Sequence, residues 1–587
     1  MAGSTGQVFN VLNPAYAGGA DRAGTADCSA AFQAALNALA AYGGGTLYVP
    51  AGDYLLANGV TWDSSAPLRL AGDGPQASNI RCASTSTSIT YVSITNTGSI
   101  TQSGNDGTVI VENMAFYNDH YAGAYADTNI GLYLDNVNFG KIANVGFYKG
   151  AASQRINQAI VLNACNQIDI DNCNIFAAVN GVAVTGFSQV NNIRSTSIWT
   201  PGGTGVATAA GVLVQGQCLT QHMSQVVFHD GDRGLYWTKD SEGKVPHLFF
   251  GYDIEPNNHS IAAMEFDDGA QVYLNQCLFS AALSILNGNI PGLVFGSDFQ
   301  GSAIVNGCVF NGQQGHTVQI GGGTGFLFTG CEFGGGGKYK YAANTYDEIN
   351  IASGVAAVTI DACHFNVDAL AGHGTSNSPR SAVYAAPGAR EVTLANSRGA
   401  GAAGYGTSPI LDQASAVMRR GNIGLGLADS TAGSGSTVTT AAGANLSASF
   451  TIPANDATVG TVYKLTCWGT GTQAAGKAVA LNIGLAIGGA SLGAFPAAAS
   501  LAAGTAFSWR YECCLHVTAT GSSGSITPSE MFIGGSTPTV CSNSAQTVNT
   551  AQANQIALTA SWASATGSPA ITCTGTILER LPSFPAS

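Results

Sequence analysis

Short segments in which apolar and polar residues alternate recur along most of the chain, and this pattern predicts β-strands rather than helices. Between about residues 80 and 405 the segments share a signature, apolar-x-Asn-small-x-aromatic, as in IVENMAF and YLNQCLF. The aromatic positions lie one period of roughly 23–32 residues apart, or two, which indicates a solenoid. We expect three short strands and three turns per period, that is, a parallel β-helix of roughly 11–13 coils. The aromatic positions of eight copies are Phe116, Phe147, Phe176, Phe228, Phe279, Phe310, Phe333 and Phe365.

One segment alone shows clear helical periodicity. Its apolar residues Phe32, Leu36 and Leu39 lie at i, i+4 and i+7. A candidate N-cap, Asp27, precedes them, and three glycines follow. We therefore expect an amphipathic helix over 28–42 that closes the N-terminal end of the solenoid, because a solenoid needs a capped end.

The composition changes near residue 406. Segment 406–432 is expected to carry a last coil into a Gly/Ser-rich linker. Beyond it, 433–587 alternates in weakly charged strands, which predicts a C-terminal β-sandwich or jelly roll. The expected chain is all-β, with a cap over 1–60 and the parallel β-helix over 61–405. Strands with so little charge suit burial against further copies, so we expect a homotrimer, with the sandwich serving trimerisation or the binding of a carbohydrate or receptor.

Charge and composition exclude several classes of partner. The 587 residues are only 9% charged and carry a formal net charge of −13, which argues against nucleic acid and anionic membranes. No apolar run reaches the length of a membrane span, and the opening MAGSTGQVFN lacks the features of a secretory signal. The fourteen cysteines lie mostly in apolar strand patterns and are expected to be buried, reduced thiols. No metal site and no cofactor are expected.

The segment 7–56 carries a recognisable series of motifs. It contains Phe9-Asn10-Val11, an acidic Gly-rich turn, the helix with A-A-F-Q-A-A-L, and the run GGTLYVPAGDY. This opening resembles that of the pectate-lyase-like single-stranded right-handed β-helix family, which includes bacteriophage tailspikes. With the repeats that follow, the resemblance covers about two thirds of the chain and implies a right-handed β-helix. It implies no catalytic residue, because lyases, hydrolases and non-enzymatic spikes share this fold.

Within this family, the expected C-terminal domain and the lack of a signal peptide resemble a phage tailspike more than a secreted pectinase. The expected protein is made in the host cytoplasm, belongs to the virion tail, and binds a bacterial surface polysaccharide outside the cell. Its expected partners are that polysaccharide, further copies of itself and other tail proteins. Depolymerisation, by hydrolysis or by β-elimination, and non-enzymatic adhesion on a rigid shaft both stay open. A free polysaccharide-degrading enzyme is a third alternative.

The polar residues are densest between 222 and 268, where twelve charged residues and four histidines lie among aromatic residues. Aromatic rings stack on sugars, and a pair of carboxylates can act as acid and base or nucleophile on a glycosidic bond. The alternative is an ordinary solvated rim. The residues predicted to contact substrate are His229, Asp230, Asp232, Arg233, Tyr236, Trp237 and Tyr252.

Strand alternation suggests which residues carry the catalysis. In FGYDIEP, Tyr252 is expected to share one face with Ile254, which leaves Asp253 and Glu255 together on the other. Asp253 and Glu255 are therefore predicted catalytic residues.

A second predicted carboxylate pair lies in AMEFDDG. Glu265 and Asp267 are expected to point outward and to be catalytic. Residues i and i+2 of a strand lie about 6.5–7 Å apart, within the range of roughly 6.5–9.5 Å typical of inverting glycosidases. Asp230 and Asp232 come about one period before the acids of FGYDIEP and are expected to stack beside them.

Overall fold

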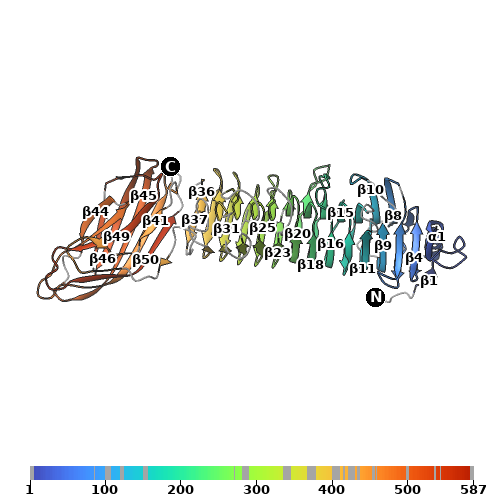
Figure 1. The fold of residues 1–587 in the computed structure, drawn as a ribbon, viewed down its shortest axis with the longest axis horizontal. Helices are drawn as coiled ribbons and strands as arrows, with labels where there is room; N and C mark the ends of the chain where they lie inside the picture. The colour runs from blue at the N-terminus through green and yellow to red at the C-terminus, as the bar shows by residue number, and fades with distance from the viewer. Residues whose placement is uncertain are drawn as a thin grey trace. The chain divides into compact units, whose positions relative to one another are not determined.

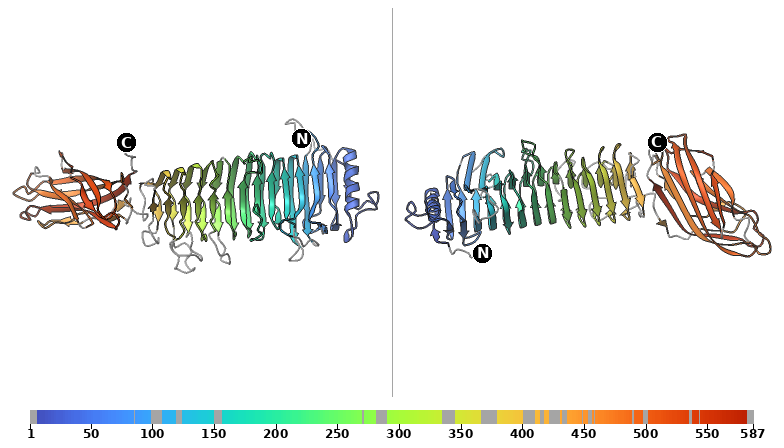
Figure 2. Two further views of the ribbon diagram at one scale, coloured as in Figure 1. Left: turned by 90° about the horizontal axis from the view of Figure 1, so that it is seen from above. Right: turned by 180° about the vertical axis from the view of Figure 1, so that it is seen from behind.

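In the computed structural model, the chain divides into two compact units: Met1–Phe326 with Gly336–Tyr341, and Leu327–Gly335 with Ala342–Ser587. Parallel strands occur in both units, and antiparallel sheets occur in the second (Figures 1 and 2). The structure describes residues 6–84, 86–98, 108–118, 124–149, 156–269, 271–280, 290–334, 345–365, 379–399, 410–413, 417–420, 430–431, 436–447, 449–452, 456–457, 459–488, 490–497, 502–534, 537–542 and 544–581.

The parallel strands form two sheets, here called sheet A and sheet B, as expected for a parallel β-helix. Sheet B has 13 described strands. They are β5 (Val60–Asp63), β8 (Ser88–Thr95), β10 (Thr128–Asp135), β12 (Gln158–Asn163), β15 (Asn180–Thr185), β17 (Ala210–Gln215), β19 (Arg233–Thr238), β21 (Ala262–Phe266), β24 (Leu293–Phe295), β27 (Val318–Ile320), β30 (Ile349–Ile351), β33 (Val383–Ala385) and β36 (Ile410–Asp412).

Sheet A has 24 described strands, because most coils contribute two stretches to it. They are β1 (Val8–Asn10), β2 (Ala23–Asp27), β3 (Gly45–Val49), β4 (Gly52–Leu56), β6 (Leu68–Gly72), β7 (Ser78–Cys82), β9 (Val109–Asn118), β11 (Asn138–Lys149), β13 (Asn166–Asp171), β14 (Asn174–Phe176), β16 (Asn191–Trp199), β18 (Thr220–His229), β20 (Leu248–Asn257), β22 (Gln271–Asn275), β23 (Leu278–Ser280), β25 (Ser302–Asn306), β26 (Val309–Asn311), β28 (Thr324–Thr329), β29 (Glu332–Gly334), β31 (Ala356–Asp361), β32 (His364–Phe365), β34 (Arg390–Ala395), β35 (Arg398–Gly399) and β37 (Val417–Arg420).

The single described helix, α1 (Ser29–Tyr42), is the predicted N-terminal helix. The predicted N-cap is wrong by one residue, because Cys28 occupies that position and makes no side-chain cap hydrogen bond. The Asp27 carboxylate still accepts the Ser29 backbone N–H at 2.9 Å, which satisfies one of the unpaired donors of the first turn. The helix ends at Gly43, whose φ of 97° is readily adopted only by glycine.

A bend divides each coil's stretch of sheet A into a first and a second segment, and it accounts for the asparagine of the earlier copies of the signature. Asn113, Asn144 and Asn172 adopt left-handed φ angles of 57°, 53° and 52°. Asparagine tolerates this conformation better than most residues. In later coils the register gives the same place to Ser195, Gln225, Asp253, Gln276, Gly307, Gly330, Ala362 and Asn396, all with positive φ.

The signature aromatics stack inside the coils. Phe116 and Phe147 have ring centroids 4.9 Å apart at an interplanar angle of 5°, close to the spacing of adjacent strands. Seven of the eight predicted positions are buried, but Phe176 points outward and Ile175 takes its place in the core. Thirteen cysteine side chains are described as thiols, and all except Cys514 are buried, as expected.

The second unit contains two antiparallel sheets of eight and five strands, which confirms the predicted sandwich. The larger sheet contains β38 (Ser430–Thr431), β39 (Thr437–Val438), β42 (Val462–Thr472), β45 (Ala506–Ala519), β46 (Gly524–Gly534), β47 (Thr537–Ser542), β48 (Gln546–Val548) and β50 (Ala570–Leu581). The smaller contains β40 (Ala444–Asn445), β41 (Phe450–Ile452), β43 (Leu481–Ile487), β44 (Ala490–Ala497) and β49 (Asn554–Trp562).

Candidate functional site

Four of the predicted site residues meet on the outer side of sheet B, on the adjacent strands β19 and β21 and at the residue that directly follows β21. We call Arg233, Tyr236, Glu265 and Asp267 the β19–β21 cluster. Tyr236 pairs with Glu265 in the strand register. Met264 and Phe266 are fully buried, so alternation directs Glu265 and Asp267 outward, as the sequence predicts.

Polar contacts connect the four side chains. The Arg233 guanidinium forms an ion pair with Glu265 and also lies over the Tyr236 ring, 4.2 Å from its centroid. A further Arg233 N–H donates to the Ala207 carbonyl at 3.1 Å. The Tyr236 hydroxyl donates to Asp267 at 2.8 Å. Each carboxylate is thus oriented by a neighbour on the preceding coil.

The two carboxylates lie in different electrostatic environments. Burial raises the pKa of Glu265 above its usual value, and the attraction of Arg233 opposes this shift without cancelling it. Burial, together with the hydrogen bond to Asp267, raises the pKa of Tyr236 to about 12, so its hydroxyl remains a donor at neutral pH. A buried acid beside a second carboxylate is the arrangement that separates acid and base roles in glycosidases.

A glycine directly after the next strand, β24, leaves room for the Asp267 side chain. A Cβ atom built at Gly296 would come within 2.2 Å of a carboxylate oxygen of Asp267 and 3.0 Å of its Cα. Any larger residue at Gly296 would therefore displace the Asp267 side chain.

Trp237 and Asp232 do not belong to an exposed site. Trp237 is 1% exposed and packs in the core with its ring 5.6 Å from Phe249, so its predicted contact with substrate is wrong. Alternation along β19 directs it inward, next to the outward Tyr236. Asp232 is buried and accepts hydrogen bonds from Ser260 and Thr204, which indicates that it holds neighbouring loops together.

The predicted faces of β20 are partly wrong. Tyr252 is 46% exposed whereas Ile254 is buried, so these two residues do not share a face. The reason is Asp253, which occupies the bend with a φ of 51° and interrupts the alternation. Glu255 follows the bend and accepts a hydrogen bond from Asn257 at 3.2 Å. Asp253 and Glu255 lie on sheet A, apart from the β19–β21 cluster on sheet B.

The predicted stacking of Asp230 and Asp232 on the acids of β20 is also wrong. Glu255 pairs with Val227, and Asp230 instead receives a side-chain hydrogen bond from Asn258. This coil is 28 residues long, so the acids fall out of register. His229 stacks on Trp199 with ring centroids 3.8 Å apart. Trp199 is 39% exposed, and the charge pattern of the sequence did not point to it because it lies outside the charged region.

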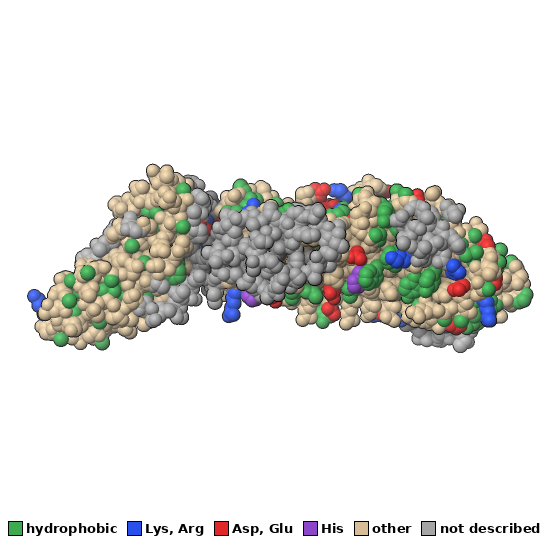
Figure 3. Space-filling model, viewed as in Figure 1, with side chains coloured by type: hydrophobic (Ala, Val, Ile, Leu, Met, Phe, Trp, Pro, Cys, Tyr) green, Lys and Arg blue, Asp and Glu red, His purple; other side chains and the backbone are tan. Residues whose placement is uncertain are grey.

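A second group of residues, which the charge pattern of the sequence did not point to, lies on the first segment of sheet A. Asp169, Asp171 and Arg194 form an ion-pair group there, near the exposed Tyr252. Their signal in the sequence is the outward position at i and i+2 in IDID, one coil before Arg194. Charged side chains gather on the parallel coils in the view of Figure 3, whereas the antiparallel part shows very few.

Neither a metal cluster nor a membrane-spanning helix occurs in the described ranges. They contain no group of three or more His, Cys, Asp or Glu side chains placed to hold a metal ion. No helix among the described residues has both the length and the apolar character needed to cross a bilayer.

No family model matches the chain, and neither does any curated protein. Among solved structures it is similar to tailspike protein 3 of bacteriophage CBA120, with 14% identity, 69% of this chain and 60% of that chain covered, and a TM-score of 0.49. It is similar to the N-terminal fragment of bacteriophage phi29 gene product 12, at 14% identity, 70% of each chain and a TM-score of 0.49. It is also similar to the A-module of the Azotobacter vinelandii mannuronan C-5 epimerase AlgE6, with 14% identity, 71% of this chain and 94% of that chain covered, and a TM-score of 0.39. The chain thus spans 60% of the CBA120 tailspike.

Proposed function

We propose that this chain is a tailspike-like protein that binds a bacterial surface polysaccharide and hydrolyses it at the β19–β21 cluster. The observation that carries the proposal is the pair Glu265 and Asp267, which point outward two residues apart at the end of β21 and directly after it. Burial raises the pKa of Glu265 above its usual value. A carboxyl group with a raised pKa beside a second carboxyl group fits the acid and base roles of glycoside hydrolysis.

In the proposed reaction, Glu265 is the general acid and Asp267 the general base. The separation of about 6.5–7 Å between alternate residues of a strand leaves room for a water molecule, so we expect inversion at the anomeric carbon. Asp267 takes a proton from this water as its oxygen attacks the anomeric carbon. The glycosidic C–O bond breaks, and the leaving oxygen takes the proton of Glu265. Tyr236 orients Asp267, and Arg233 orients Glu265.

The proposed setting is the tail of a virion, with the protein acting outside the cell as a homotrimer beside other tail proteins. The weakly charged antiparallel strands of the second unit support self-association, because little charge needs to be desolvated when copies pack together. Light scattering on the full chain measures the oligomeric state.

A non-enzymatic shaft is the second candidate function. It is favoured by the ion pair between Arg233 and Glu265, since a guanidinium in direct contact with a carboxyl group stabilises the ionised form of that group. On that alternative the cluster joins neighbouring coils and performs no chemistry.

The deciding experiment measures reducing ends released from a panel of bacterial capsular and cell-wall polysaccharides. We expect Glu265→Gln and Asp267→Asn each to lower the rate by about 100-fold or more, since general acid–base catalysis contributes roughly 10²–10⁴-fold. Asp253→Asn and Glu255→Gln are the matched controls and should retain the wild-type rate. Binding of a polysaccharide without any release of reducing ends would favour the shaft. Unchanged cleavage in both cluster variants would place catalysis elsewhere.

A further inference from the structure

A groove of about 430 Å³ lies on the first segment of sheet A, apart from the β19–β21 cluster on sheet B. Two rows of outward side chains border it. One row runs through His222, Phe250 and Tyr273, and the other through Arg194 and Tyr252. The groove therefore crosses the strands of four successive coils, β16, β18, β20 and β22, along the axis of the stack.

The first row is an aromatic wall. The rings of His222 and Phe250 have centroids 4.9 Å apart at 14°, and those of Phe250 and Tyr273 are 5.0 Å apart at 17°. These stacked rings line the groove and give it an apolar side, against which the C–H groups of a sugar can pack. Burial lowers the pKa of His222, so this wall is uncharged at neutral pH.

Tyr252 gives the opposite wall an accessible ring. It is 46% exposed, and the register places Ser224 and Asn275, two smaller polar residues, on either side of it. Its ring can therefore stack on a pyranose, while the neighbouring hydroxyl and amide offer hydrogen bonds to sugar hydroxyls.

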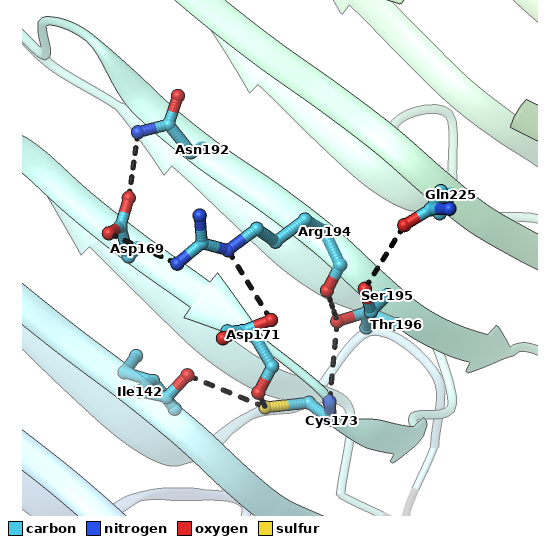
Figure 4. A network of polar contacts seen from close by, with 9 residues as sticks. All are labelled: Ile142, Asp169, Asp171, Cys173, Asn192, Arg194, Ser195, Thr196 and Gln225. Atoms are coloured by element: carbon cyan, nitrogen blue, oxygen red, sulfur yellow. Dashed lines mark hydrogen bonds and ion pairs between the residues drawn. The ribbon is translucent and has the colours of Figure 1, made fainter. Parts of the chain in front are cut away.

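At one end of the groove, the lining residues Asn192 and Arg194 contact two carboxylates of the preceding coil (Figure 4). Arg194 lies between two carboxylates, 3.3 Å from Asp171 and 3.6 Å from Asp169. The Asn192 amide donates to Asp169 at 2.7 Å. The two carboxylates and one guanidinium sum to a charge of −1, and Arg194 is already engaged by both acids. This end of the groove thus repels an anionic sugar and tolerates a neutral or cationic one.

We propose that this groove is a binding site for a neutral or amino-sugar segment of a glycan, laid along the stack of coils and independent of the β19–β21 cluster. The inference takes from the proposed function the glycan nature of the ligand, and it does not depend on cleavage. The combination of an aromatic wall, an exposed tyrosine and paired carboxylates suits hydroxylated rings better than an apolar peptide. A glycan held here would keep the protein on its polymer while another stretch reaches sheet B.

The test uses isothermal titration calorimetry on the full chain carrying Glu265→Gln, so that no probe is cleaved. The probes are oligomers of N-acetylglucosamine and of glucose, oligomers of glucosamine, and oligomers of galacturonate. We expect binding of neutral or amino-sugar oligomers and at least tenfold weaker binding of galacturonate oligomers. Tyr252→Ala should lower the affinity for the probe that binds at least tenfold. Tyr42→Ala, which removes a 62% exposed tyrosine on α1, should change this affinity less than twofold.

The inference is overturned if no neutral or amino-sugar probe binds, if galacturonate binds best, or if Tyr252→Ala binds like its parent. It is also overturned if Tyr252→Ala changes the oligomeric state in light scattering while glycan affinity stays the same, since the groove would then join copies of the chain. The experiment tests this inference separately from the proposed function. Loss of affinity in Tyr252→Ala supports the groove even where the chain with Glu265 intact cleaves nothing.

Discussion

At the scale of single residues, the role of each acidic side chain depends on whether it lies on a regular strand, at a backbone bend or in a buried turn. Glu265 lies on a regular strand, faces outward and is still mostly covered, so burial raises its pKa. Asp253 carries the same type of group, but it forms a left-handed bend of the backbone. Asp232 is buried among hydrogen-bond donors that stabilise its ionised form, and its pKa is lowered despite the cost of burial. Three acids close in sequence thus have three different roles.

The raised pKa of Glu265 predicts how stability depends on pH. Above the usual pKa of 4.5, the folded chain keeps a proton on Glu265 that the unfolded chain has lost. This contribution to the free energy of unfolding is complete below pH 4.5 and is lost as pH rises through the folded-state pKa. In urea denaturation between pH 4 and 7, Glu265→Gln should therefore lose less stability on raising the pH than the wild type does. Glu242→Gln, at an exposed ion pair, should follow the wild type; equal slopes for Glu265→Gln and wild type would contradict the prediction.

At the scale of elements, small residues at one position of the sheet B strands allow the aromatic core to form. Gly131, Gly181, Gly211 and Gly234 precede the first inward side chain of their strands, in segments such as NGVAV and AGVLV. A Cβ atom at Gly211 would lie 2.5 Å from the Phe228 ring. These glycines are therefore required by the close approach of core side chains, Phe147, Ile198 or Phe228, and of neighbouring backbone carbonyls, and not by an unusual φ.

Gly211→Val should destabilise the chain by about 1–3 kcal/mol, because a larger side chain forces the Phe228 ring out of its position. Chemical denaturation followed by tryptophan fluorescence measures the change. Gly443→Val is the matched control, since a Cβ there meets no atom within 4 Å, and its effect should stay within about 0.5 kcal/mol. If the Gly211→Val and Gly443→Val proteins have the same free energy of unfolding, the core accommodates the larger side chain without loss of stability, and the prediction is wrong.

At the scale of the whole molecule, a deeply buried ion-pair group joins distant parts of the described chain. In the second unit, Arg580 of β50 is 1% exposed and lies 2.6 Å from Asp412 of β36 and 3.5 Å from Asp456. Tyr463 also donates to Asp456 at 2.8 Å. The pair from β36 and β50 connects a parallel strand with an antiparallel one within this unit, so that both depend on one guanidinium.

Arg580→Met should lower the free energy of unfolding of the second unit by about 3–5 kcal/mol, because it leaves two buried carboxylates without their cation. Differential scanning calorimetry follows the transition of this unit. Arg510→Met is the control, since its side chain is 56% exposed and its ion pair with Glu512 should contribute about 0–1 kcal/mol. Equal transitions for the two variants would refute the importance of the buried pair.

The sequence by itself determined the features that repeat with a local period. The alternation of apolar and polar residues predicted the strands, the spacing of the phenylalanines predicted the coils, and the i, i+4, i+7 pattern predicted α1. It also placed Glu265 and Asp267 outward, because β21 is a regular strand. These properties depend only on neighbours along the chain.

The tertiary structure alone decided which residues of different coils lie side by side. Hydrogen-bonded neighbours are 23 residues apart at Cys165 and Ser188, 28 at Asp230 and Asn258, and 34 at Cys363 and Ser397. The turns set these intervals, so no single period predicts that Tyr236 meets Asp267 or that Arg194 lies between two aspartates. Bends such as Asp253 also reset the alternation within a strand. Lateral contacts in a solenoid thus depend on the length of every turn, which local patterning does not encode.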